Sequence, residues 1–500
     1  MRLDIRVPGW YQLGSMSQAS DHPPLCGIGP SDRPLHVHLM GICGTGMAAL
    51  AGLFHERGDV VTGSDNGVYP PMSDFLHSLG IEVMQGYSAG NLEPRPDLVV
   101  VGNVIRRTNH EAVALERSGI PFISMPEALN RCFAGQRTRI VVAGTHGKTT
   151  LSSMIAWVLD TVNLEPGFMI GGLPRNFRTN HRLGTGRFFV IEGDEYDTAY
   201  FDKQPKFLHY HPHIGVITSC EFDHADIYDS LEQIQRQFRA FAALIPQHGC
   251  LVACWDDPNV RQIVAGLDIP VRSYGTGSDA EWSLSGVEES RDCVRVTVMR
   301  NGRPAATGTL PVIGFHNTLN AIAAVAVAER CGVDPQEAVS ALGSFRGVKR
   351  RQEVLGEAAG IMVMDDFAHH PSAVKVTCEA VRSRFRDRRV VAVFEPRTNT
   401  SRRAFFQQLY VPAFSDADLV VVREPRDVES IPPAERFDSG RLATYLRALV
   451  KDAHVFEETS GVLEFLRNNL QPNDIVLVMS NGNFDNLAPR LLDALREREP

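Results

Sequence analysis

The sequence predicts an α/β protein built from three domains, and three observations support this fold class. Its 500 residues correspond to roughly three domains at about 150 residues each, and each third is long enough to bury its own core. From residue 35 onward, short apolar runs alternate with helix-length amphipathic segments, which is typical of βαβ units and parallel sheets. The runs at residues 97–102 and 139–143 have apolar centres, as expected of strands buried on both faces.

The composition and the charge exclude several classes of protein. An apolar fraction of 43% and a charged fraction of 22% argue against general disorder. A net charge of -9 argues against nucleic acid as a partner, because such proteins usually need a basic surface. No uncharged apolar stretch reaches the roughly 18 residues of a membrane span, so we expect no membrane partner. The start lacks a signal segment and the nine cysteines lack zinc-ligand spacing, which predicts reduced thiols and a cytoplasmic location.

The order of elements along the chain suggests where the domains begin. Residues 1–34 are rich in Pro, Gly, Ser and Asp without a clear period, and we expect a loose extension there. Breaks are expected near residues 134–137, just before a new strand, and near residues 344–347, where basic residues follow a helix. The predicted domains are therefore 35–136, 137–344 and 345–500. Within the central one, residues 275–310 alternate apolar and polar, which predicts an antiparallel hairpin before a helix at Asn317.

The strongest functional signal is a phosphate-binding loop between a strand and a helix. The loop and helix start consist of Gly144, Thr145, His146, Gly147, Lys148, Thr149 and Thr150. Amide N–H groups at a helix start bind anions, Lys148 supplies positive charge to the β- and γ-phosphates, and a threonine hydroxyl can hold Mg²⁺. The first glycine of the usual pattern is replaced by Val142, so the loop is a variant. The alternative is a chance Gly-Lys-Thr at a helix start, and nucleotide binding is the stronger interpretation.

Two later strands are expected to end at the same edge of the sheet. One ends at Glu192 before an acidic run, and the other leads to Asp223 and His224. Ligands of open parallel sheets lie beyond the carboxyl ends of the strands, so Lys148, Glu192 and His224 are predicted to meet around one phosphate as catalytic residues. Thr149, Glu192 and His224 are the predicted metal ligands. The alternative is a solvated acidic loop with His224 as a helix cap.

A second glycine-rich turn opens the first predicted domain. Gly41, Gly44 and Gly46 follow a strand with the spacing Gly-x-x-Gly-x-Gly, which differs from the pattern of dinucleotide folds. The next strand ends at Asp65, where an acid can bind a ribose hydroxyl. A diphosphate or nucleotide is favoured over a structural turn, although NAD remains open. Two phosphate sites suggest that one nucleotide is consumed and another is carried by the substrate.

The order of these motifs resembles the Mur ligase family over about residues 35 to 490. The matching stretches are the first glycine-rich turn, the phosphate loop, Asp223-His224, and residues 314–320, 347–351 and 365–371. The branch that adds a murein tripeptide is favoured over the branch that adds free L-alanine by residues 68–73, 195–203, 206–210, 221–227, 395–400 and 479–482. Many family members use a carbamylated lysine after the Asp-His pair to help hold magnesium. This chain has no lysine between Lys206 and Lys349, and the branches that add the first residue or a tripeptide also lack that carbamylated lysine. Gly193 departs from the family, which usually has alanine there.

The resemblance implies a fold, an activity and a set of partners. The fold would comprise a Rossmann-like N-terminal domain, a P-loop-type ATPase central domain and a Rossmann-like C-terminal domain. The activity would be an ATP-dependent ligase that joins UDP-N-acetylmuramate to the murein tripeptide L-Ala-γ-D-Glu-meso-diaminopimelate through an acyl phosphate. ATP and Mg²⁺ would be its cofactors, and UDP-N-acetylmuramate and the tripeptide its partners.

The resemblance also assigns roles by position. Beyond the phosphate loop, it implies that the ATP site includes His316, Asn317, Asn320, Arg351 and Asp366. It implies that the UDP part of the substrate binds at Gly41, Gly44, Thr45, Gly46 and Asp65.

Amide formation adds further candidates, because the reacting groups must be held in line and a hinged third domain closing over the site would do so. His369 and His370 are candidates for contact there, and their alternative role is a packed or capping histidine before Pro371. Arg397, with Arg402 and Arg403 nearby, is predicted to bind tripeptide carboxylates, and the alternative is a solvated basic loop.

Three other functions stay open from the sequence. The same chemistry with free L-alanine as acceptor is the nearest. A folate polyglutamate ligase would share the last two domains but not the first glycine-rich one. A nucleotide switch or binding module without turnover is disfavoured, because Glu192 and His224 both follow the loop.

Overall fold

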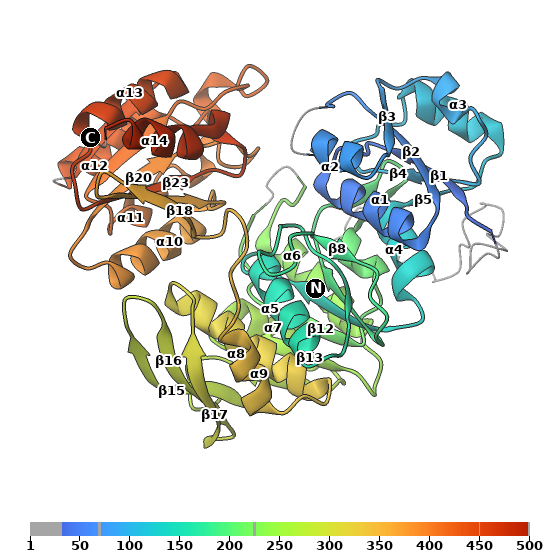
Figure 1. Cartoon of the computed structure of the whole chain (residues 1–500), viewed down its shortest axis with the longest axis horizontal. Coiled ribbons are helices and arrows are strands. Elements are labelled where there is room, and N and C mark those ends of the chain that lie inside the picture. The colour runs from blue at the N-terminus through green and yellow to red at the C-terminus, as the bar shows by residue number, and fades with distance from the viewer. Residues whose placement is uncertain (1–32, 69–71, 224–226, 450, 499–500) are drawn as a thin grey trace, which may run out of the picture.

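The computed structural model describes residues 33–68, 72–223, 227–449 and 451–498. Its three large sheets follow one another along the chain and form the three bodies of Figure 1, coloured blue, green to yellow, and orange to red. Helices cover these mainly parallel sheets, so the predicted α/β fold class is confirmed. Most of the predicted extension lies outside the described residues, and its last part is tied down where Arg33 pairs with Asp97 at 2.7 Å.

The first sheet has five parallel strands in the order β3-β2-β1-β4-β5. They are β1 (His36–Met40), β2 (Val60–Asp65), β3 (Glu82–Gln85), β4 (Leu98–Val101) and β5 (Phe122–Ser124). The helices are α1 (Thr45–Arg57), α2 (Met72–Ser78), α3 (His110–Ser118) and α4 (Met125–Leu129), with short turns η1 (Ala89–Leu92) and η2 (Asn130–Ala134). Because α1 follows β1 directly, its N-terminus lies at the carboxyl edge of the middle strand.

The central sheet has ten strands in the order β17-β16-β15-β14-β13-β12-β6-β9-β7-β8. They are β6 (Thr138–Ala143), β7 (Gly167–Met169), β8 (His181–Arg182), β9 (Phe188–Glu192), β12 (Ile214–Ile217), β13 (Cys250–Cys254), β14 (Val271–Tyr274), β15 (Trp282–Glu289), β16 (Val294–Arg300) and β17 (Arg303–Leu310). A separate small sheet joins β10 (Asp197–Ala199) to β11 (Asp202–Pro205), which leads to η3 (Lys206–His209). The predicted antiparallel hairpin is present but larger, because β17 pairs with β16 as a third antiparallel strand.

The helices of the central body cover both faces of this sheet. They are α5 (Lys148–Thr161), α6 (Leu231–Ala243), α7 (Pro258–Val264), α8 (Phe315–Arg330) and α9 (Pro335–Leu342). One apolar cluster contains α5, α8 and α9 residues, and another joins α6 and α7 to the core of the first body. The strand β6 lies between β12 and β9 and runs parallel to both, so three carboxyl ends stand side by side.

The third sheet has the order β18-β19-β23-β20-β21-β22, with only β18 antiparallel to its neighbour. The strands are β18 (Glu353–Ala358), β19 (Ile361–Asp366), β20 (Arg389–Phe394), β21 (Leu419–Arg423), β22 (Asp452–Phe456) and β23 (Asp474–Met479). The helices and turns are α10 (Pro371–Arg384), η4 (Ala404–Phe406), α11 (Tyr410–Ala413), η5 (Pro433–Glu435), α12 (Ser439–Ala448), α13 (Thr459–Asn469), η6 (Phe484–Asn486) and α14 (Leu487–Arg496). Separate apolar clusters bury its two faces.

Two further observations bear on the sequence expectations. Across the described ranges, no helix is both long enough and apolar enough to cross a bilayer. The eight cysteines that the structure describes are all free thiols.

Candidate active site

The predicted phosphate loop lies at the middle of the central sheet, between β6 and α5. Gly144 adopts φ +129°, and a Cβ atom there would lie 2.1 Å from Thr218 Oγ1, so this turn accepts only glycine. Gly147 adopts φ +83° and precedes the first residue of α5. Val142 occupies a buried position of β6 opposite Glu192, so the missing first glycine falls in the strand rather than in the turn.

Lys148 is held by a buried carboxylate. Its ammonium group donates to Gly144 O at 2.7 Å and to the two oxygens of Glu195 at 3.0 and 2.8 Å. Burial would lower the pKa of Lys148, but Glu195 and Asp194 raise it above its ordinary value, so the charge persists. The sequence interpretation missed Glu195. The acidic run after β9 can be recognised in the sequence. The path of the loop, however, decides which of its carboxylates contacts Lys148.

Thr149 and Glu192 form the oxygen-rich side of the site. The Thr149 hydroxyl donates to Glu192 Oε1 at 2.7 Å, and the Gly171 amide donates to Glu192 Oε2 at 2.6 Å. Arg351 reaches in from the start of the third body and donates to Thr149 Oγ1 at 3.2 Å. A hydroxyl and a carboxylate side by side are ligands that suit Mg²⁺. The third predicted metal ligand, His224, lies outside the described residues.

The start of α8 supplies amide and imidazole groups to the same region. Asn317 Nδ2 donates to Gln352 Oε1 at 2.9 Å, and Asn320 Nδ2 donates to Asn317 Oδ1 at 3.2 Å. The bond from Asn317 joins the central body to Gln352 of the third one, and Asp366 of the third body accepts the backbone N–H of Gln352 at 2.6 Å. Burial lowers the pKa of His316 to about 4, so its imidazole is neutral at pH 7.

One cavity of about 430 Å³ brings most of the predicted residues together. It lies between the phosphate loop, the start of α8 and the region from β19 to α10. The predicted residues that line it are Thr145, His146, Gly147, Lys148, Thr149, Thr150, Glu192, His316, Asn317, Asn320, Arg351, Asp366 and His369. Gly144, the first residue of the loop, does not line the cavity. The lining residues Glu221, Ser219, Gln352 and Asn481 were not singled out from the sequence.

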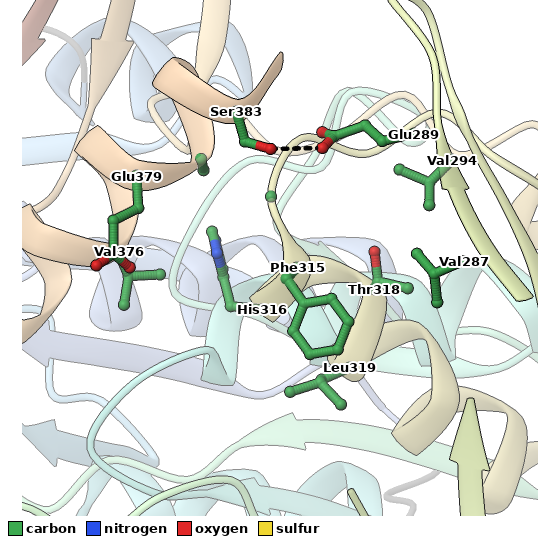
Figure 2. A pocket seen from close by; sticks show the side chains of 12 residues that line it. Val287, Glu289, Val294, Phe315, His316, Thr318, Leu319, Val376, Glu379 and Ser383 are labelled. Atoms are coloured by element: carbon green, nitrogen blue, oxygen red, sulfur yellow. Dashed lines mark hydrogen bonds between the residues drawn. The ribbon is translucent and has the colours of Figure 1, made fainter. Parts of the chain in front are cut away.

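A second, more apolar cavity of about 380 Å³ adjoins the first beyond His316. Figure 2 shows Phe315 and Leu319 below it, Val287 and Val294 on the strand side, and Val376 and Glu379 on the side of α10. Ser383 of α10 donates a hydrogen bond to Glu289 of β15 at 2.7 Å. The central and third bodies therefore enclose both cavities between them.

The first glycine-rich turn lies apart from this cavity, in the blue body of Figure 1. Gly41 adopts φ +80°, and its amide donates to Ser64 O at 2.8 Å, while Gly44, Thr45 and Gly46 open α1. The Asp65 carboxylate accepts the amides of Cys43 and Gly67, each at 2.9 Å, so it holds the turn in place.

The remaining predicted substrate residues lie in the third body. His370 caps the N-terminus of α10, and its Nδ1 accepts the Ser372 amide at 3.3 Å. His369 Nδ1 lies 3.0 Å from Phe367 O. Arg397 is exposed next to Gly482 and does not line the main cavity.

Family comparison assigns the class of this protein. Three models match in order: the Mur ligase family catalytic domain at residues 36–137, the Mur ligase middle domain at 142–328, and the Mur ligase glutamate ligase domain at 350–482. The chain therefore belongs to the Mur ligase family, whose members are ATP-dependent ligases that form amide bonds.

Individual relatives show which ligases of the family this chain is similar to. The chain is 39% identical over 465 residues, 93% of its length and 99% of the relative's, to the UDP-N-acetylmuramate–L-alanyl-γ-D-glutamyl-meso-2,6-diaminoheptandioate ligase of Escherichia coli (strain K12). It is 33% identical over 465 residues, 93% of its length and 98% of the relative's, to a UDP-N-acetylmuramate–L-alanine ligase of an Anaeromyxobacter species. A solved murein peptide ligase from Psychrobacter arcticus is 32% identical, with a TM-score of 0.69 over 93% of this chain and 100% of its own.

Proposed function

We propose that this protein is an ATP-dependent ligase that joins UDP-N-acetylmuramate to the murein tripeptide L-Ala-γ-D-Glu-meso-diaminopimelate, in peptidoglycan recycling in the cytoplasm. The observation that carries the proposal is the 39% identity to a ligase of that name over nearly the whole of both chains. The site agrees with it in chemistry. A phosphate loop, a charged lysine and a Thr-Glu pair line one cavity between two bodies, as an enzyme that activates a carboxylate requires.

The chemical problem explains why these groups are needed. A carboxylate does not react with an amine in water, because oxide is a very poor leaving group. A carboxylate oxygen attacks the γ-phosphorus of ATP and forms a new O–P bond, which gives an acyl phosphate. The bond between the γ-phosphorus and the oxygen that bridges to the β-phosphate breaks, and ADP leaves with that electron pair. The amine then attacks the carbonyl carbon, phosphate departs with the C–O electron pair, and the amine loses a proton.

This chain's residues would reduce the repulsion between the two anions in the first step. Lys148 keeps its charge beside Glu195 and would contact the transferring phosphoryl group together with the loop amides. Thr149 and Glu192 offer neighbouring oxygens for Mg²⁺, with His224 as the third candidate ligand. The bound Mg²⁺ would supply charge neutralisation at the phosphate oxygens. Arg351, which donates to Thr149, would add a second positive group.

The arrangement of bodies suggests how the two substrates meet. The glycine-rich turn of the first body, with Gly41, Gly44, Thr45, Gly46 and Asp65, would hold the UDP group. The third body would bring the tripeptide amine, with Arg397 as a partner for its carboxylates. An α-amino group has a pKa near 8, so a useful fraction is neutral without a strong base. Positioning would therefore supply much of the rate.

A coupled assay tests this proposal. Phosphate release should require ATP, Mg²⁺, UDP-N-acetylmuramate and a peptide amine together. In a competition between L-alanine and the tripeptide, the tripeptide product should dominate. Preferential formation of the L-alanine adduct would instead assign the chain to the other branch, and phosphate release without either substrate would indicate a simple nucleotide hydrolase.

A further inference from the structure

A cluster of two histidines and a glutamate lies where the central and third bodies meet. His146 belongs to the phosphate loop, Glu221 follows β12, and His370 precedes α10. His146 Nε2 lies 3.4 Å from Glu221 Oε2, and His370 Nδ1 lies 3.6 Å from the same oxygen. The two imidazole rings face each other with centroids 5.1 Å apart. His146 lies 75 residues and His370 149 residues from Glu221 in the sequence, yet both converge at one carboxylate oxygen.

These distances equal those between neighbouring ligands around a metal ion. Zinc bonds to imidazole nitrogen and carboxylate oxygen of about 2.0–2.2 Å place neighbouring ligand atoms of a tetrahedron about 3.3–3.6 Å apart. Both measured separations at Glu221 fall at that spacing. One ligand atom from each of the three residues lies within 4.8 Å of the others, so small side-chain rotations complete the set.

The protonation states favour ligation as well. Burial alone would raise the pKa of Glu221, but hydrogen bonds with His146 and Ser372 hold it below its ordinary value, so the carboxylate is ionised at pH 7. Burial lowers the pKa of His370, so its imidazole is neutral at pH 7. His370 is only 5% exposed, and its Nε2 atom has no hydrogen-bond partner within the described part of the chain. When the ring turns toward a metal ion, it gives up the long hydrogen bond from Ser372 and its contact with the backbone of Phe222.

We propose that His146, Glu221 and His370 form a binding site for a zinc-class transition-metal ion that bridges the central and third bodies. The donor set of two imidazoles and one carboxylate prefers Zn²⁺, Co²⁺ or Ni²⁺ to Mg²⁺, which takes oxygen ligands. It is thus a different site from the oxygen pair at Thr149 and Glu192. Three protein ligands leave the fourth position of the ion for water. An ion bound here would hold α10 against the phosphate loop and so restrain the separation of the two bodies. This inference does not rest on the proposed function.

The first experiment measures metal binding directly on the full chain. Co²⁺ is added to the metal-free protein in the presence of excess Mg²⁺, and the visible absorption of tetrahedral Co²⁺ is followed, with Zn²⁺ as competitor. One Co²⁺ per chain should bind with a nitrogen and oxygen spectrum and should be displaced by Zn²⁺. A thiolate-to-cobalt charge-transfer band would place the ion on cysteines and overturn the proposal.

Three conservative variants remove one ligand each. His370→Asn keeps a side chain that caps α10, Glu221→Gln keeps the acceptor for Ser372, and His146→Gln keeps a polar group of similar length. Each should weaken Co²⁺ binding at least about tenfold, since even indirect ligand supports carry that much affinity. His55→Gln, at an exposed histidine of α1, should bind as the wild type does. Unchanged binding in all three ligand variants would overturn the site.

A second measurement covers the case that a variant folds poorly. Zn²⁺ should raise the thermal unfolding midpoint of the wild type and of His55→Gln, because an ion that binds only the folded chain stabilises it. The same Zn²⁺ should raise the midpoint of each variant that has lost a ligand by less than it raises that of the wild type. An equal rise in all of them would mean that the ion binds elsewhere.

Discussion

At the scale of single residues, the Lys148–Glu195 pair combines stability with chemistry. Both side chains are nearly buried, at 13% and 5% exposure, and their closest atoms are 2.8 Å apart. Removing one partner of a buried pair leaves the other charge in a poorly solvated place, which typically costs 3–5 kcal/mol, whereas removing both costs much less. A loss of activity in a lysine variant could therefore reflect misfolding, and the pair offers a way to separate the two effects.

The lysine prediction uses that difference. Lys148→Ala should abolish phosphate release and should also lower the free energy of unfolding by about 3 kcal/mol, because Glu195 stays behind. The double variant Lys148→Ala/Glu195→Gln should recover most of the stability and none of the activity. Denaturant unfolding and a phosphate assay measure the two effects. Clear phosphate release by the stable double variant would contradict the assigned role of the lysine.

A second residue-scale prediction concerns the metal requirement of the reaction. Glu192→Gln removes the negative charge but keeps an oxygen for the Thr149 hydroxyl, so the fold should survive. The Mg²⁺ concentration for half-maximal activity should rise at least about tenfold. Asp197→Asn is the matched control, since Asp197 belongs to the same acidic run but pairs with Lys203 outside the cavity. An equal Mg²⁺ shift in both variants would argue against a specific role for Glu192.

At the scale of elements, strands were predictable and side-chain partners were not. The apolar run at 97–102 contains β4, and the run at 139–143 differs from β6 by one residue, because buried strands carry their own hydrophobic pattern. The antiparallel insertion was predicted as two strands, since the alternation is clear in β16 but β17 (Arg303–Leu310) is mostly polar and small.

The parts of the site that could not be predicted depend on how separate elements pack. Glu195, not Glu192, faces Lys148 because the turn after β9 folds back over η3, which no local pattern specifies. Glu221 contacts Ser372 of α10 only because the third body lies against the central one. Asp65 accepts the backbone amides of Cys43 in the turn after β1 and of Gly67, contacts that its position at a strand end did not specify, and its contact with ribose stays a prediction.

The turn after β9 yields an element-scale prediction. A Cβ atom on Gly193 would lie 2.9 Å from Val141 Cγ1 and 3.1 Å from Phe207 Cβ, so alanine, which the resemblance associates with this position, does not fit this packing. Gly193→Ala should lower the free energy of unfolding by about 1–3 kcal/mol through overpacking. Gly90→Ala, whose Cβ would meet nothing closer than 3.6 Å, should change stability little. Equal stability of both variants, measured by denaturant unfolding, would refute this explanation of the glycine.

At the scale of the whole molecule, neutral histidines concentrate where the central and third bodies meet. Burial lowers the pKa of His316 and of His369 to about 4, against an ordinary value of 6.5. The unfolded chain therefore binds more protons than the folded one between pH 6.5 and 4, and stability falls as the pH decreases through that window. Asp365 opposes this trend. Burial raises the pKa of Asp365 to about 6, so its buried charge destabilises the folded state near neutral pH. Protonation of this carboxylate on acidification therefore stabilises the folded state.

The balance of these groups predicts acid sensitivity of the whole fold. Two histidines outweigh one aspartate, so lowering the pH from 7 to 5 should reduce the free energy of unfolding by roughly 2 kcal/mol. His369→Gln should make this decrease smaller, because one acid-sensitive group is gone. Asp365→Asn should make it larger, because the opposing group is gone. Urea unfolding of the three proteins at pH 7, 6 and 5 measures the slopes. Parallel slopes in all three would show that neither group governs the acid response, and a stability that rises on acidification would reverse the predicted sign.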